Sequence, residues 1–266
     1  MSDLRIFSYL PNPRIWKATI AARLCGVDVE IRGASTKELP EWLWDFNARR
    51  LSTTEKSSLE HLARVGSVGL TSTLYKTDDF LQANPFGTVP AAFSPDGSIG
   101  IFESNSILRV VARLGSAVTP LYGRDVFSAS RIDGFLDASL LFSRDVQTYI
   151  LSLRAGSISP ASYESTRQAM STYLSGIERA LRQTSAFVAG QELSIADICF
   201  FVELSLLFNE YAHHELLNVA GLQPLISPAS RDQFSVAFTH FDKLRSHDAF
   251  APDAETFLSD LISLGL

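Results

Sequence analysis

The sequence predicts two domains of different class: a mixed α/β domain first, then an all-helical domain. Three observations support this prediction. The first thirty residues alternate as strand, helix and strand, a strand–turn–strand pattern and a helix occupy residues 88–114, and strand signals are lacking beyond about residue 124. We place the α/β domain at residues 1–115, with an insertion at about 36–72, and the helical domain at 124–266.

The β-α-β start of the chain has clear local signals. Residues Leu4–Tyr9 alternate between apolar and polar side chains, as in a strand. Asn12 suits the position before a helix and Pro13 suits its first turn, while Gly26 suits its end. Residues Val27–Ile31 alternate again, and two strands joined by a helix lie parallel and adjacent in a sheet.

The insertion has weaker signals. Residues Glu38–Phe46 are compatible with a helix, and Ser57–Val65 form a second, weak helical pattern. A connection this long in a compact domain is usually functional or disordered. The aromatic side chains of Trp42, Trp44 and Phe46 lead us to expect a lid over a hydrophobic site.

Composition excludes several classes of function. The formal net charge is -6 and Lys and Arg do not cluster, so nucleic acid is not an expected partner. The most apolar stretch, Ile198–Phe208, is short and contains Glu203, so no membrane span is expected. Cys25 and Cys199 lie far apart without zinc-ligand spacing, so no metal is expected. We expect a cytoplasmic protein with two buried thiols.

Thr88, Val89 and Pro90 begin a predicted strand at a position where proline is a poor partner, because it donates no hydrogen bond. One explanation is a cis Val89–Pro90 peptide bond that turns the backbone groups of Val89 outward, towards an extended peptide. The alternative is an ordinary proline of an edge strand.

Glu103 and Ser104 lie where a predicted strand passes into a helix. The Ser104 hydroxyl and the free amides of the helix start suit a carboxylate, while Glu103 suits an ammonium group. Together these groups fit an α-amino acid end, such as the γ-glutamyl end of glutathione. The alternative is plain capping of the helix by Ser104.

The order and spacing of these motifs resemble the glutathione site of the glutathione transferase family. Residues Asn84–Pro90, followed after a hairpin by Phe102–Ile107, carry the resemblance. It implies a thioredoxin-like N-terminal domain, an all-α C-terminal helical bundle and glutathione as co-substrate. It also implies that the cis Val89–Pro90 segment pairs with the cysteinyl part of glutathione and that Glu103 and Ser104 hold its γ-glutamyl end.

Two further segments extend the resemblance. Residues Asn12–Ala18 are most similar to the transferase-like module of elongation factor 1 gamma. Ser194 and Asp197 form a capping box, which stabilises a helix start by about 1 kcal/mol. This box resembles the one at the central helix of the family's C-terminal domain.

The group that activates the glutathione thiol is expected near the start of the first helix, where an anion is favoured. The candidates are Ser8, Tyr9, Asn12 and Arg14. We favour Ser8 with Asn12, because short donors approach a thiolate closely, and Arg14 as an electrostatic helper. The alternative is that Tyr9 packs in the core, or activates the thiol instead, and that Arg14 is a surface cation.

The resemblance implies attack of the glutathione thiolate on a hydrophobic, aromatic electrophile, and the aromatic insertion is compatible with cleavage of β-aryl ethers. The alternatives are a non-catalytic interaction module of the elongation factor 1 gamma type, or a glutathione-dependent isomerase or peroxidase. A dimer is implied, either with itself or with a related chain. Candidate linings of the electrophile pocket are Leu10, Phe127, Phe135, Phe142, Tyr149, Phe208 and Tyr211.

Overall fold

The expected β-α-β start is present in the structure, a computed structural model that describes residues 2–66 and 69–265. Strand β1 (Leu4–Tyr9) leads into helix α1 (Pro13–Cys25), and β2 (Val29–Ala34) returns parallel to β1. The Asn12 side chain accepts a hydrogen bond from the Arg14 N–H at the start of α1. Gly26 ends the helix at φ 72°, a left-handed conformation that glycine adopts without steric cost.

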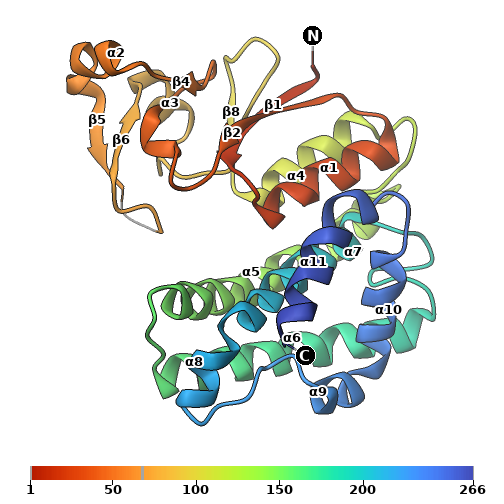
Figure 1. Cartoon of the computed structure of the whole chain (residues 1–266). Helices are drawn as coiled ribbons and strands as arrows, with labels where there is room; N and C mark the ends of the chain where they lie inside the picture. The colour runs from red at the N-terminus through yellow and green to blue at the C-terminus, as the bar shows by residue number, and fades with distance from the viewer. Residues whose placement is uncertain (1, 67–68, 266) are drawn as a thin grey trace. The chain divides into compact units, whose positions relative to one another are not determined.

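A four-stranded mixed sheet forms the centre of the first domain, in the order β2-β1-β7-β8. Strand β7 (Ala91–Phe93) is antiparallel to β1, and β8 (Gly100–Phe102) is antiparallel to β7. Helix α4 (Ser104–Leu114) packs against α1, and the two helices lie side by side in Figure 1. This arrangement confirms the thioredoxin-like α/β domain.

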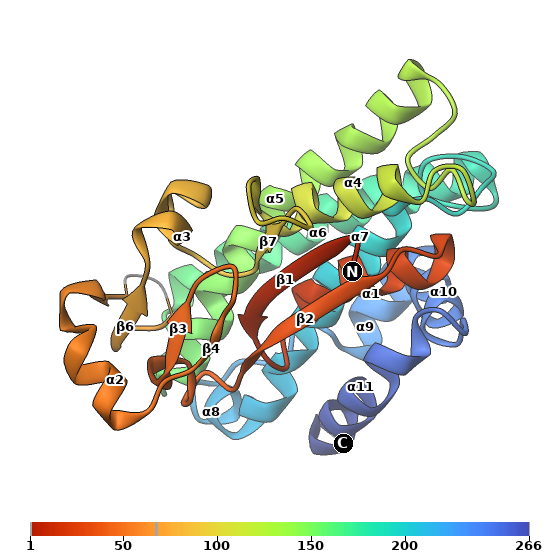
Figure 2. The same cartoon turned by 90° about the horizontal axis from the view of Figure 1, so that it is seen from above.

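The insertion forms a second sheet of four short strands, in the order β4-β3-β6-β5. Figure 2 shows β3, β4 and β6 of this sheet beside the first one. The elements between β2 and β7 are η1 (Leu39–Glu41), β3 (Trp42–Trp44), β4 (Arg49–Arg50), α2 (Thr53–Ser58), η2 (Glu60–Leu62), β5 (Ala63–Val65), β6 (Thr73–Lys76) and α3 (Asp78–Ala83). Residues 67 and 68 of the predicted insertion lie outside the described residues.

Of residues Glu38–Phe46, whose sequence is compatible with a helix, only Leu39–Glu41 form a helical turn, because strand β3 follows directly. The expectation of a lid is wrong. The Trp44 side chain is 1% exposed, and its ring lies 5.3 Å from Phe7 and 5.8 Å from Phe80. Phe46 packs on Phe93, with the guanidinium of Arg5 over its ring. These aromatic side chains form a core on one face of the first sheet and hold the second sheet against it.

The second part of the chain is helical, as predicted. The chain divides into two compact units, Met1–Val118 and Thr119–Leu266, and the described residues of the second unit contain no strand. Its elements are α5 (Val126–Arg154), α6 (Pro160–Thr184), α7 (Ile195–Leu207), η3 (Phe208–His213), α8 (His214–Val219), α9 (Pro228–Gln233), α10 (Ser235–Arg245) and α11 (Ala251–Gly265).

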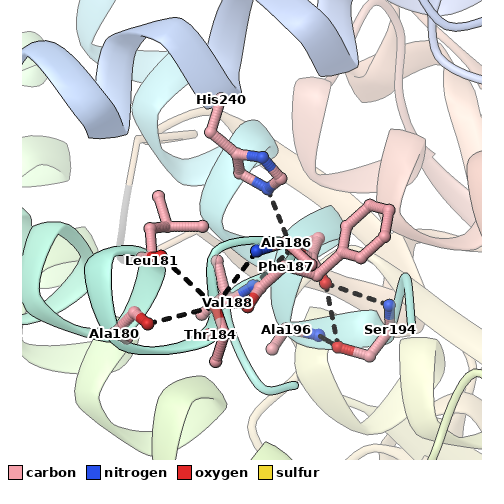
Figure 3. A network of polar contacts seen from close by, with 10 residues as sticks. Ala180, Leu181, Thr184, Ala186, Phe187, Val188, Ser194, Ala196 and His240 are labelled. Atoms are coloured by element: carbon pink, nitrogen blue, oxygen red, sulfur yellow. Dashed lines mark hydrogen bonds and ion pairs between the residues drawn. The ribbon is translucent and has the colours of Figure 1, made fainter. Parts of the chain in front are cut away.

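Helix α7 is the centre of the second unit, since its side chains are buried on nearly every side. The predicted capping box is confirmed: the Asp197 carboxylate accepts hydrogen bonds from the N–H and the hydroxyl of Ser194. Its other oxygen accepts the Val188 N–H at 2.8 Å and lies 2.9 Å from Nε2 of His240. Figure 3 shows three of the residues that contact this carboxylate, Val188, Ser194 and His240.

Candidate functional site

Strand pairing brings the predicted site residues to one end of the first sheet. Phe7 of β1 pairs with Ala91 of β7, and Ala91 pairs in turn with Phe102 of β8. Ser8 near the end of β1, Pro90 just before β7 and Glu103 just after β8 therefore lie at the same end of the sheet. Residues distant in sequence are thus brought to one end of the sheet by the pairing of β1, β7 and β8.

The segment before β7 presents backbone groups rather than side chains. The Val89–Pro90 peptide bond is cis, as the family resemblance implied, and so is the Leu10–Pro11 bond, which was not expected. Within residues 2–66 and 69–265, neither the N–H nor the C=O of Val89 takes part in a hydrogen bond. A half-buried backbone with free groups of both kinds is able to pair with an extended peptide.

Two side chains hold the turn that precedes Val89. The Asn84 side-chain amide donates to the Thr88 carbonyl at 2.7 Å. The Lys76 ammonium donates to the Gly87 carbonyl, also at 2.7 Å, and lies 4.8 Å from the centre of the Trp44 ring. Burial lowers the pKa of Lys76. Sequence reasoning missed Lys76, the last residue of the short strand β6 in the second sheet.

The junction between β8 and α4 has an unusual backbone. Glu103 has φ 67° and ψ 125°, a conformation that costs a residue with a side chain about 1–3 kcal/mol. It holds the capping position of α4 without a side-chain cap, so capping by Ser104 is wrong. The Glu103 carbonyl accepts the N–H groups of Ser106 and Ile107, while the Glu103 side chain is exposed. Backbone strain retained beside a helix start indicates a local functional constraint.

Ser104 is the first residue of α4, and its Oγ accepts a hydrogen bond from the Lys17 ammonium at 3.1 Å. Lys17 also donates to Oδ1 of Asn105 at 2.7 Å. Sequence reasoning missed Lys17, because 87 residues separate it from Ser104. No local motif distinguishes Lys17 from the other residues of helix α1.

The four candidates for thiol activation fall into two groups. Ser8 and Asn12 are buried and bonded to each other, since the Asn12 amide donates to Ser8 Oγ at 3.0 Å. This bond leaves the Ser8 hydroxyl hydrogen available to another acceptor. Tyr9 and Arg14 are half-buried. Tyr9 packs against the aromatic core on the opposite face of β1 from Ser8, as strand alternation requires.

Most of the aromatic residues expected to line an electrophile pocket have other surroundings. Phe142, Tyr149 and Phe208 are buried in the core of the helical unit, whereas Phe127 is 84% exposed. The Tyr149 hydroxyl donates to the buried carboxylate of Glu210. These residues stabilise the helical unit, so a pocket lining is wrong for the three buried ones.

No group of three or more His, Cys, Asp or Glu side chains suited to a metal ion occurs in the described part of the chain. None of the described helices is both long and apolar enough to cross a membrane.

Comparison with known proteins places these features in a family context. A family model described as glutathione S-transferase, N-terminal domain, matches residues 13–114. The glutathione S-transferase-like protein FUS3 of Gibberella moniliformis is 25% identical over 198 residues, which cover 73% of this chain and 72% of that protein. Elongation factor 1-gamma of Prunus avium is 33% identical over 129 residues, which cover 46% of this chain but only 29% of that protein.

A glutathione S-transferase from Methylobacillus flagellatus, solved with GSH bound, has the same fold. Its TM-score is 0.62 at 14% sequence identity, and the match covers 94% of this chain and 98% of that one. Because the identity is low, the structural likeness supports the fold, and the family model supports the N-terminal domain.

Proposed function

Because this chain belongs to the glutathione S-transferase superfamily, we propose that it binds glutathione at the edge of its first sheet and transfers it to a hydrophobic, aromatic electrophile. Binding would use the backbone of Val89, beside Pro90, for the cysteinyl part. Glu103 and Ser104 would hold the ammonium and the carboxylate of the γ-glutamyl end. The structure solved with GSH bound supports glutathione as the ligand.

One observation carries this proposal: the Val89 N–H and C=O have no hydrogen-bond partner among residues 2–66 and 69–265, one strand away from Glu103. An extended tripeptide satisfies both backbone groups in the manner of an added strand. Its amino-acid head then reaches the start of α4, where helix amides and the Ser104 hydroxyl favour a carboxylate.

The chemistry that follows is nucleophilic substitution. The thiolate forms a bond from sulfur to an electrophilic carbon, and the bond from that carbon to the leaving group breaks, with the electron pair departing on the leaving group. For a β-aryl ether, the leaving group is an aryl oxide, which takes up a proton from solvent. Each unit by which the pKa of the glutathione thiol is lowered requires about 1.4 kcal/mol of preferential stabilisation of the thiolate. We assign stabilisation of the thiolate to the Ser8 hydroxyl, oriented by Asn12. Arg14 would act as an electrostatic helper, and Tyr9 is the alternative donor.

Calorimetric titration with glutathione, followed by turnover of a chloronitrobenzene and of model aryl ethers, tests the function. Ser8→Ala and Asn12→Ala are each expected to lower turnover while the protein still binds glutathione. The exposed Ser116→Ala provides a matched control. Unchanged turnover in both site variants would move the thiol assignment to Tyr9 or Arg14, and failure of the unmodified protein to bind glutathione would refute the function.

A second candidate function is a glutathione transferase-like module that binds a protein partner without catalysis. The similarity to elongation factor 1-gamma favours it, although the aligned region spans less than a third of that protein. Glutathione binding without turnover of any electrophile would support this second function. We also propose a cytoplasmic protein that forms a dimer, with itself or with a related chain, which sedimentation at several concentrations tests.

A further inference from the structure

Lys17 is a buried cation directly behind the start of α4. Its side chain is 1% exposed, although lysine is almost never buried without oxygen acceptors. Two such acceptors are Ser104 Oγ at 3.1 Å and Asn105 Oδ1 at 2.7 Å. The ammonium therefore sits at the first turn of α4, on the inner side of the residue assigned to the γ-glutamyl end.

This contact determines which way the Ser104 hydroxyl points. An ammonium group only donates hydrogen bonds, so Ser104 Oγ must act as the acceptor towards Lys17. The hydroxyl hydrogen is then directed away from Lys17. Within the described residues, neither this hydrogen nor the Ser104 N–H has an acceptor.

Ser104 thus offers two donors of one residue at the positive end of a helix. The residue before it, Glu103, is an exposed carboxylate that offers only acceptors. The two neighbouring residues therefore present opposite hydrogen-bonding character, which matches the carboxylate and the ammonium of a free α-amino acid end.

We propose that Lys17 is a positioning residue that fixes Ser104 as a double donor, so that the site selects a γ-glutamyl end with its α-carboxylate present. This inference rests on the proposed binding of glutathione. Lys17 does not contact the ligand, because Ser104 lies between them. Its ammonium acts through the orientation of the Ser104 hydroxyl and through the positive charge that it places behind the helix start.

The unmodified protein provides the first test. Its affinity is measured by calorimetry for glutathione and for 4-aminobutyryl-cysteinyl-glycine, which lacks only the α-carboxylate. We expect glutathione to bind at least tenfold more tightly, a difference of about 1.4 kcal/mol. Equal affinity for the two peptides would overturn this inference, whereas no binding of glutathione at all would refute the proposed function instead.

The second test uses Lys17→Met, with the exposed Lys37→Met as the control for the lost charge. We expect Lys17→Met to weaken glutathione binding about tenfold and to leave binding of the aminobutyryl peptide unchanged. The KM for glutathione should rise, and kcat at saturating glutathione should stay within about twofold. Equal weakening of both peptides would overturn the inference.

A double-mutant cycle tests whether Lys17 acts through Ser104. Adding Lys17→Met to Ser104→Ala is expected to cause less than a further threefold loss of glutathione affinity. If Lys17 acts only through the Ser104 hydroxyl, its removal has little effect once that hydroxyl is absent. Independent, multiplying losses would contradict the positioning role. If Lys17→Met does not fold, Lys17→Gln removes the charge with a similar side-chain length and is judged by the same ratio of affinities.

Discussion

Two polar clusters, one in each unit, start from the same local feature, the first turn of a helix. In the helical unit, Asp197 is fully buried, and its carboxylate accepts hydrogen bonds from Ser194 and Val188 and contacts His240. In the first unit, Lys17 is 1% exposed, but Ser104 beside it is half-buried, and its hydroxyl hydrogen and N–H have no acceptor among the described residues.

The difference between the clusters separates two uses of buried charge. The Asp197 cluster is enclosed, with both carboxylate oxygens engaged, so it stabilises the fold at the start of α7 (Figure 3). In the Lys17 cluster, the Ser104 hydroxyl and N–H lie at a helix start and have no acceptor within residues 2–66 and 69–265. Burial of a charged group alone therefore does not separate a structural cluster from a binding one, and we infer the binding role of the first cluster from the donors that Ser104 retains. The predictions below test this distinction, beginning with the largest effect.

Asp197→Ala removes the acceptor of at least four groups at the start of α7. Breaking a buried network of this kind costs about 3–5 kcal/mol, so the midpoint of urea unfolding should fall strongly. The exposed Asp248→Ala serves as the control and should unfold like the unmodified protein. A loss below about 1 kcal/mol would show that the enclosed cluster is not a stabilising one.

Glu210 makes the helical unit sensitive to pH. Its burial raises its pKa to about 7, although the N–H groups of Ile226 and Leu225 and the Tyr149 hydroxyl act in the opposite direction. Between the glutamate value of the unfolded chain, 4.5, and about 7, only the folded state holds this proton. The resulting stability is fully present below about pH 4.5 and is lost as pH rises through about 7.

The free energy of unfolding is expected to fall by about 3 kcal/mol over this pH range because of Glu210. Unfolding by urea at several pH values should show this decline, and Glu210→Gln should flatten it relative to the unmodified protein. The exposed Glu215→Gln provides the control and should keep the decline. A pH dependence that survives Glu210→Gln would assign it to other groups.

Ser104→Ala should affect binding and not folding. We expect about a tenfold loss of glutathione affinity, which equals about 1.4 kcal/mol, with a change in the unfolding free energy below about 0.5 kcal/mol. Ser106→Ala is the matched control, because Ser106 is also a half-buried serine near the start of α4. If Ser104→Ala destabilised the protein as Asp197→Ala does, the two clusters would share one role.

Glu103→Gly should raise stability and lower affinity together. Glycine relieves the cost of φ 67° but loses more chain entropy on folding, so a net gain of about 1 kcal/mol is expected in urea unfolding. Glu103→Ala removes the carboxylate and keeps the strain, so it should lose affinity without gaining stability. A destabilised Glu103→Gly variant would show that the backbone at this position is unstrained.

The sequence predicts the parts of the fold that local signals determine. Strand β1, helix α1 with Asn12 before it and Gly26 after it, and the box of Ser194 and Asp197 all depend on neighbours within a few residues. Strand β3 could not be predicted in this way. Three consecutive apolar residues, Trp42–Trp44, are compatible with either a helix or a strand. Their strand conformation is determined by packing on Phe7 and Phe80.

The site was predictable only in its outline. The motifs that place Val89 and Glu103 are local, and strand pairing then brings them together. The contact that orients Ser104, the neighbour of Glu103, is not local, since Lys17 is 87 residues from Ser104. No periodicity of a single sequence reports such pairs, which arise from the packing of whole helices.

The central claim is that a glutathione backbone pairs with Val89 while its amino-acid head meets Ser104. Titration of glutathione into the ¹⁵N-labelled protein tests this claim most directly, because each amide reports its own hydrogen bond. We predict saturable shifts of the Val89 and Ser104 amide resonances, and no shift of those of Val188 and Ser194. Val89 and Ser104 amides that do not move at saturating glutathione would contradict the account.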